Sequence, residues 1–180
     1  MNFRHLALTN YLTFLILTIA LTSLQCSLWL QFFGYFPSPY MWIPTLVYWA
    51  LYRRIHEGLL MCYMLVITTV SLSSIPISLF LFLNLIFYAL AILIKQRIYW
   101  NGPTYLMLIS GITSMTLTFF HFILSWILET KPIVDPEILD GILSGLFTSL
   151  VSLPLYYIFA KIDHVTNKEL PTEAGTGKYE

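Results

Sequence analysis

Apolar residues run through the chain in long stretches that are separated by short polar or charged turns. The stretches cover residues 8–33, 40–52, 58–75, 77–94, 104–128 and 136–160. About 20 residues of α-helix are needed to cross the hydrocarbon core of a bilayer, and all but the second stretch come close to that length or exceed it. The pattern predicts an all-α integral membrane protein with six transmembrane helices in one bundle.

The second stretch is the weakest of the six. At 1.5 Å per residue, a helix over residues 40–52 reaches only about 20 Å. Pro37, Pro39 and Pro44 lie at or before its start, and proline fits the first turn of a helix better than its interior. We predict a short or partly re-entrant segment, and the sequence leaves open whether residues 40–52 span the bilayer completely.

Composition agrees with a membrane protein. Hydrophobic residues make up 58% of the chain and charged residues 10%, whereas soluble proteins carry about 25% charged residues. Between Glu57 and Glu129 there is no Asp or Glu. Because the end of the chain is polar, we expect a transmembrane domain over residues 1–162 and a disordered cytoplasmic tail over residues 163–180.

Basic and aromatic residues predict the orientation. If the N-terminus is cytoplasmic, six crossings place every Lys and Arg except Lys131 on the cytoplasmic side, which satisfies the positive-inside rule. Trp42 and Trp126 then fall at outer ends of the predicted helices, and Trp49 and Trp100 at inner ends, as in the aromatic belts of membrane proteins. We expect a multi-pass protein with both termini in the cytoplasm.

A charged turn, residues 53–57, separates two of the apolar stretches and is predicted to be cytoplasmic. It can be a topology anchor, with Glu57 near the start of the third helix, where the helix dipole favours a negative charge. It can also be a docking point at which Arg53, Arg54, His56 and Glu57 bind a cytoplasmic or membrane-embedded partner. The sequence is compatible with both interpretations.

Small residues recur along one side of the last predicted helix, at Gly141, Gly145, Ser149 and Ser152. Such a stripe allows close approach of two helix backbones in a membrane. It can pack within the protein's own bundle or bind the single helix of a partner. These four residues are therefore candidate partner-binding residues.

Asn84 and His121 are polar residues within apolar stretches. Polar groups in a membrane are costly unless they are paired or line water, so each predicts either an interhelical hydrogen bond or a role in ligand binding or conduction. We expect no proton- or sodium-coupled relay, because the membrane segments that contain Asn84 and His121 have no carboxylate that could bind the ion. Ser, His and acidic residues also do not lie together at one membrane depth, as an intramembrane hydrolase would require. We expect no enzymatic activity and no catalytic residues.

Metal, cofactor and nucleotide sites are not predicted. Cys26 and Cys62 lie inside apolar stretches without metal or redox spacing, so we expect two buried free thiols. The "GTGK" near the chain end is not a phosphate-binding loop, because Thr172 stands where the motif needs glycine and Tyr179 where it needs Ser or Thr. We expect no bound metal, no cofactor and no nucleic-acid partner.

Two runs of the sequence resemble the rod shape-determining protein MreD family. The run "PSPYMWIPTLVYWALYRRIHEGLL" is similar to that family's second helix and following turn, where a proline-led apolar helix ends in an aromatic residue, basic residues and a glycine. The run "LFTSLVSLPLYYIFAKID" resembles the family's final helix, with its proline, paired aromatics and closing basic-x-Asp. The middle run "IPISLFLFLNLIFYALAILIKQR" and the chain length also fit. The third predicted helix departs from the family, because Ser and Thr stand where the family has further glycines and an acidic residue.

The resemblance implies a non-enzymatic scaffold subunit of the bacterial cell-elongation machinery in the inner membrane. Such a subunit would bind the single transmembrane helix of an MreC-like protein. It would indirectly connect MreB filaments to the RodA glycosyltransferase and its transpeptidase in peptidoglycan synthesis, and thereby control cell shape.

The same resemblance implies a fold similar to the S components of vitamin transporters. The alternative function is therefore a substrate-binding membrane subunit of a small-molecule uptake transporter, with a pocket lined by such residues as Asn84 and His121. A filled interior would favour the scaffold. A polar pocket that opens to the outside would favour the transporter.

Overall fold

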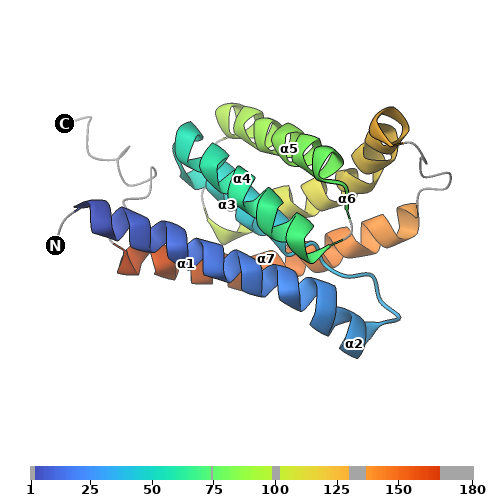
Figure 1. Cartoon of the computed structure of the whole chain (residues 1–180), viewed down its shortest axis with the longest axis horizontal. Helices are drawn as coiled ribbons and strands as arrows, with labels where there is room; N and C mark the ends of the chain where they lie inside the picture. Colours follow the sequence, from blue (N-terminus) through green and yellow to red (C-terminus); the bar gives the residue numbers. More distant parts are fainter. Residues whose placement is uncertain (1–2, 74, 99–101, 130–136, 167–180) are drawn as a thin grey trace.

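The computed structural model describes residues 3–73, 75–98, 102–129 and 137–166, and these residues form helices with short connections (Figure 1). The π-helical turn η1 joins α1 to α2, so that one almost continuous helix runs through the first predicted segment. The elements are α1 (Phe3–Ser23), η1 (Leu24–Leu28), α2 (Trp29–Phe33), α3 (Trp42–Tyr52), α4 (Ile55–Leu72), α5 (Ile77–Arg97), α6 (Pro103–Leu128) and α7 (Ile138–Val165). Of the tail predicted over residues 163–180, residues 163–165 are helical and continue α7, whereas residues 167–180 lie outside the described residues, as do Lys131 and Trp100.

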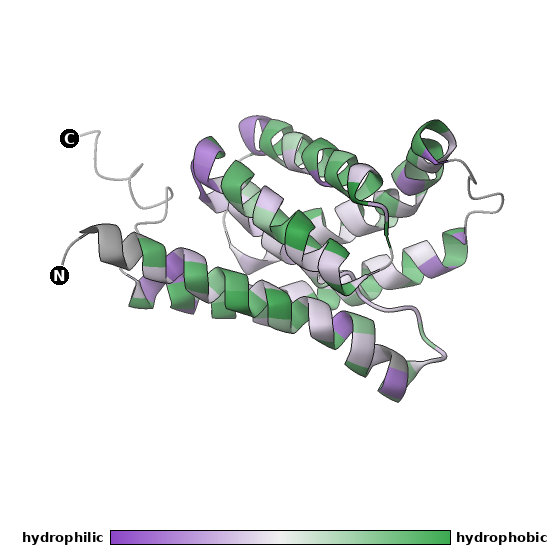
Figure 2. Ribbon diagram, in the orientation of Figure 1, coloured by the Kyte–Doolittle hydropathy of each residue, from purple (hydrophilic) through white to green (hydrophobic). Residues whose placement is uncertain are grey.

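In the part of the chain that the structure describes, five helical segments are long and apolar enough to cross a membrane: Leu8–Leu28, α4, α5, α6 and α7. Hydrophilic residues gather mostly near the helix ends, while the middles are largely apolar (Figure 2). The chain is thus an all-α, multi-pass membrane protein. The sequence predicts six such segments. The difference is α3, which has only 11 residues and is too short to count as a span among the described helices.

The short helix α3 lies at the centre of the bundle. It contacts α1, α4, α5, α6 and α7, and these five helices close a ring in which α1 meets α4, α4 meets α5, α5 meets α6, α6 meets α7 and α7 meets α1. All 11 residues of α3 are buried. A helix that is apolar on every side belongs in an interior, which explains why the second segment is short and has no outward-facing polar side.

The central position of α3 changes the environment of two tryptophans. Trp42 and Trp49, expected in the interfacial belts, are 3% and 1% exposed. Trp42 packs edge-on against Phe80 of α5, with 5.0 Å between the ring centroids. Trp49 packs against Phe14 of α1 at 4.9 Å. The belt assignment is wrong for both residues, because the sequence pattern does not distinguish a central helix from a peripheral one.

The two ends of α3 lie near opposite ends of the bundle. The Met41 backbone N–H, just before α3, donates a hydrogen bond to the Gln25 side chain at 3.0 Å. Arg53, just after α3, donates one to Asn10 at 3.3 Å. Asn10 and Gln25 are about 22 Å apart along a helix of 1.5 Å rise per residue. We call the end with Asn10 and Arg53 the Arg53 end. The start of α1 and the end of α7 both lie at this end (Figure 1).

Candidate functional site

A buried ion pair joins Arg53, directly after α3, to Asp163 in the last turn of α7. Both side chains are 1% exposed. A buried charge is costly unless it is paired and hydrogen-bonded, so each residue requires the other. The sequence placed Arg53 in a candidate docking turn, whereas the structure places its guanidinium inside the bundle.

Three further side chains complete a polar cluster around Asp163. Tyr48 of α3 donates its hydroxyl proton to Asp163 Oδ2 at 2.6 Å. Asn10 of α1 donates from Nδ2 to Asp163 Oδ1 at 3.0 Å and to Thr166 Oγ1 at 2.7 Å. Both carboxylate oxygens are thus satisfied. We call Asn10, Tyr48, Arg53, Asp163 and Thr166 the lock cluster, because they connect α1, α3 and α7 at one end of the bundle.

Aromatic rings cover the rest of the Arg53 guanidinium. Its Cζ lies 5.1 Å from the Trp49 ring centroid and 5.8 Å from that of Phe14. Its Nε and Nη1 have no hydrogen-bond partner among the described residues. A cation over an aromatic face is attracted by the ring quadrupole, so the rings stabilise the part of the guanidinium that Asp163 and Asn10 do not reach.

The rest of the 53–57 turn faces outward. Arg54 and His56 are exposed and Glu57 is half-buried. Arg53 and Arg54 both have extended backbone conformations, with φ −119° and ψ 167° and with φ −71° and ψ 148°, and successive side chains of extended backbone point to opposite sides. The structure therefore separates the four residues of this candidate site, with Arg53 inside and Arg54 and His56 on the surface.

A close helix contact follows the turn. Gly58 is buried in the first turn of α4, and a Cβ at this position would collide with the hydroxyl of Tyr88 on α5. The Tyr88 hydroxyl donates a hydrogen bond to the Ile55 carbonyl at 3.0 Å. The glycine after the charged turn therefore lets α4 and α5 approach closely.

The small-residue stripe of α7 packs against α6. A Cβ at Gly141 would collide with Thr118, and one at Gly145 would collide with the Met115 side chain and lie 3.3 Å from the Gly111 carbonyl oxygen. Ser149 donates a hydrogen bond to the Met107 carbonyl at 3.2 Å.

The fourth residue of the stripe, Ser152, is buried and donates to the Thr148 carbonyl of its own helix at 2.6 Å. Of the two roles that the sequence left open, the structure accounts for packing within the bundle. Gly141, Gly145 and Ser152 are buried and so are not accessible to a partner helix in this arrangement, whereas Ser149 is half-buried.

The two polar membrane residues do not form a shared site. Asn84 is 0% exposed, and its Nδ2 donates to the Phe80 carbonyl of its own helix at 2.8 Å. The expected interhelical hydrogen bond is therefore replaced by one within α5, and Asn84 Oδ1 has no partner in the described part of the chain. His121 is half-buried on α6. No hydrogen bond between these two side chains is found among the described residues.

One small pocket lies beside the central helix. A pocket between α3 and α4 has no room for a water molecule; it is lined by Thr45, Leu46, Trp49, Gly58, Met61, Cys62 and Leu65. Both cysteines are free thiols; Cys62 is buried as expected, whereas Cys26 is only half-buried. Among the described residues no three His, Cys, Asp or Glu side chains are grouped so that they could hold a metal ion.

Sequence reasoning missed four of the five residues of the lock cluster. Asn10, Tyr48 and Thr166 were not singled out, and Asp163 entered only as the closing Asp of the last run. The available signal was a charge balance: Asp163 closes a long apolar helix, and Arg53 closes another at the same predicted membrane level. A buried pair of opposite charges is the inexpensive solution for such residues.

The fold and the cluster define the class: a multi-pass, all-α membrane protein with a buried ion pair at one end of the bundle. Comparison with protein-family models, with curated proteins and with solved structures found no match to this chain.

Proposed function

We propose that this chain is a non-enzymatic scaffold subunit of the MreD type in the bacterial inner membrane. It would belong to the rod complex that controls cell shape and peptidoglycan synthesis. Its direct partner would be the single transmembrane helix of an MreC-like protein. MreB filaments, the RodA glycosyltransferase and its transpeptidase would be indirect partners. The resemblance of the two runs that end at Leu60 and Asp163 supports the choice of this complex.

The pairing of buried polar side chains with one another at the Arg53 end is the observation that supports a scaffold most strongly. A small-molecule site is a cleft or cavity of about 300–1,000 Å³ with a few convergent polar groups. The pocket beside α3 cannot hold a water molecule, and the polar side chains of the lock cluster bind one another. A protein built in this way has its outer surfaces left for binding. The mutual pairing of these polar groups favours a scaffold over a transporter subunit, because they are not free to bind a small molecule.

Six crossings belong to the same proposal. Residues 34–41 and α3 together supply the second crossing, in agreement with the contacts of Met41 and Arg53 at opposite ends of the bundle. Both termini would then be cytoplasmic, and the positive-inside rule holds for Arg54, Lys95 and Lys161. An S-component-like fold is proposed on the resemblance alone.

The packing of the stripe against α6 changes where a partner helix would bind. Gly141 and Gly145 face α6, so an MreC-like helix would bind a lipid-facing side of the ring. Arg54 and His56 remain exposed candidates for a partner at the Arg53 end. Arg53 would support that surface indirectly, by holding the turn in place.

Affinity purification in mild detergent tests this function. The chain, tagged at one end and expressed in its own host at native level, should co-purify an MreC-like protein and components of peptidoglycan synthesis. Depletion of the chain should give rounded cells. Co-purification of an ATPase module of a transporter, together with unchanged cell shape on depletion, would contradict the proposal and favour the uptake function.

A further inference from the structure

Exposed charge is distributed unequally between the two ends of the bundle. At the Arg53 end, Arg54, Arg97 and Lys161 are exposed and Lys95 is half-buried. Of the carboxylates at this end, Asp163 is buried and neutralised by Arg53, and Glu57 is half-buried, so the four basic side chains outnumber it.

Exposed carboxylates lie at the opposite end. Glu137 and Asp140 are exposed at the start of α7, and Glu129 is half-buried after α6. No Lys or Arg lies at that end among the described residues. The surface of the Arg53 end is thus basic, and that of the opposite end is acidic.

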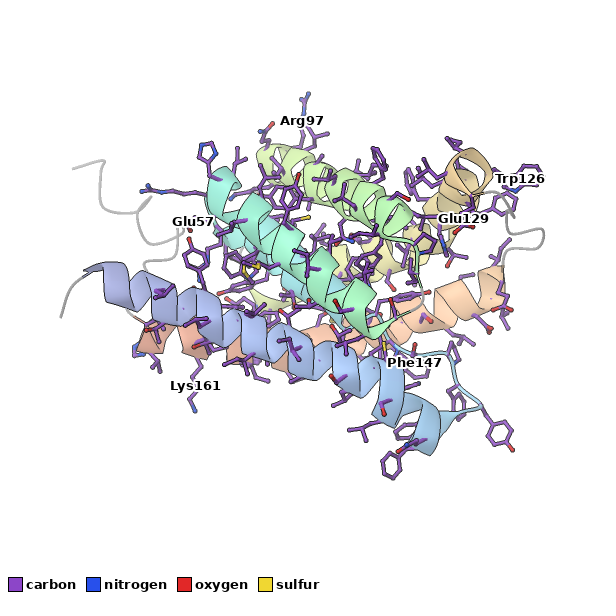
Figure 3. The ribbon with its side chains drawn as sticks, in the orientation of Figure 1. Glu57, Arg97, Trp126, Glu129, Phe147 and Lys161 are labelled. Carbon is purple, nitrogen blue, oxygen red and sulfur yellow. The ribbon has the colours of Figure 1, made fainter. Side chains whose placement is uncertain are left out.

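Two of the basic side chains lie on opposite sides of the bundle. Arg97 of α5 and Lys161 of α7 point away from the bundle on opposite sides (Figure 3). In the ring, α6 lies between α5 and α7. One partner helix cannot contact both residues, because it would have to pass around the whole end of the bundle. A ligand that surrounds the protein can contact both.

Each of these cations lies directly beside an exposed apolar surface. Leu93 and Ile98 flank Arg97 and are 56% and 58% exposed. Tyr157 lies one turn before Lys161 and is 63% exposed. In a membrane, exposed apolar side chains contact lipid tails, and long basic side chains next to them reach the headgroup level. The cations are therefore at the depth of lipid phosphates.

We propose that Arg97 and Lys161 bind the headgroups of anionic phospholipids in the leaflet at the Arg53 end. The charges are complementary, and each basic side chain near an anionic membrane surface raises the binding affinity roughly fivefold. Lipids form a continuous annulus, which matches the position of the two cations on opposite sides. The inference requires the membrane assignment and is independent of the scaffold function.

Lipid retention by the purified full-length protein tests the proposal. The protein is reconstituted in bilayers of one part phosphatidylglycerol to four parts phosphatidylcholine, extracted briefly with mild detergent, and the lipids that remain bound are quantified by mass spectrometry. We expect wild type to retain phosphatidylglycerol above its share in the bilayer. The Arg97→Gln/Lys161→Gln variant should reduce that enrichment at least about threefold, because each charge accounts for up to roughly fivefold. High salt should reduce it in wild type, since salt screens exposed charges.

Lys131→Gln is the control, because it makes the same chemical change at a position that the sequence places between Glu129 and Glu137, and these two residues lie at the acidic end. It should retain the wild-type enrichment. Melting temperature and elution volume verify that each variant is folded. Retention of the two lipids at the bilayer ratio by wild type would overturn the proposal. So would full enrichment in the double variant, or an equal loss in Lys131→Gln.

Discussion

Arg53 and Asp163 illustrate how little of a side chain's role follows from its neighbours in the sequence. Arg53 and Arg54 are adjacent and chemically identical, yet one is 4% exposed and the other lies on the surface. Local charge predicted the turn correctly. It could not predict the pairing, because Asp163 is 110 positions away and pairing is a property of the assembled bundle.

Removal of the acid should destabilise the protein strongly. Asp163→Asn leaves the buried guanidinium without its counter-charge, which costs about 3–5 kcal/mol for a pair of this kind. We expect the free energy of unfolding to fall by that amount in an SDS titration of the protein in detergent micelles. Arg54→Met, which changes an exposed arginine, is the control and should shift it by less than about 1 kcal/mol.

The double variant Arg53→Met/Asp163→Leu separates pairing from net charge. It removes both charges, so neither is left buried alone, and it should be more stable than Asp163→Asn. If the double variant lost as much stability as the sum of the losses in Arg53→Met and Asp163→Leu measured singly, the ion pair would not be the reason for the sensitivity of this site.

Arg54 and His56 give a prediction about binding. Arg54→Lys with His56→Ala retains the positive charge that orients the helices but removes the planar guanidinium and the imidazole. We expect normal insertion and reduced co-purification of the partner. Wild-type co-purification with normal rod-shaped growth would show that the turn is a topology anchor only.

At the scale of the elements, the sequence is most informative about where helices lie and least informative about which of their faces meet. Apolar length predicted the segments that became α1, α4, α5, α6 and α7, because insertion in a membrane depends on local hydropathy. Prolines predicted that the second segment is short. The partner of the Gly141–Ser152 stripe could not be predicted, because small residues allow close packing with any helix.

Gly145→Leu should now destabilise the protein itself. The leucine would have to displace Met115 and the backbone at Gly111, and overpacking of this kind typically costs about 1–3 kcal/mol. Ala89→Leu on the exposed face of α5 is a matched change from small to large and should have little effect. Unfolding in SDS measures both. Equal, small effects would show that α6 does not pack against the stripe as closely as described.

At the scale of the whole molecule, one short helix organises the rest. The ring of five longer helices supplies the lipid-facing surface, and α3 supplies the centre with its large buried side chains Trp49 and Tyr48. The lock cluster closes the bundle where α3 ends. This arrangement leaves the outer faces of the ring exposed, with large apolar side chains such as Leu93 and Leu150 on its perimeter.

The central claim is that the chain crosses from one end of the bundle to the other through α3. Cysteine labelling tests it most directly. In a variant with Cys26 and Cys62 replaced by Ser, single cysteines are placed at Tyr35, which is fully exposed before α3, and at His56, which is exposed just after it. Intact cells are treated with a membrane-impermeant maleimide. We predict labelling at position 35 and none at position 56 until the membrane is permeabilised. Labelling of both positions in intact cells would contradict the account, because α3 would then return the chain to the side from which it entered.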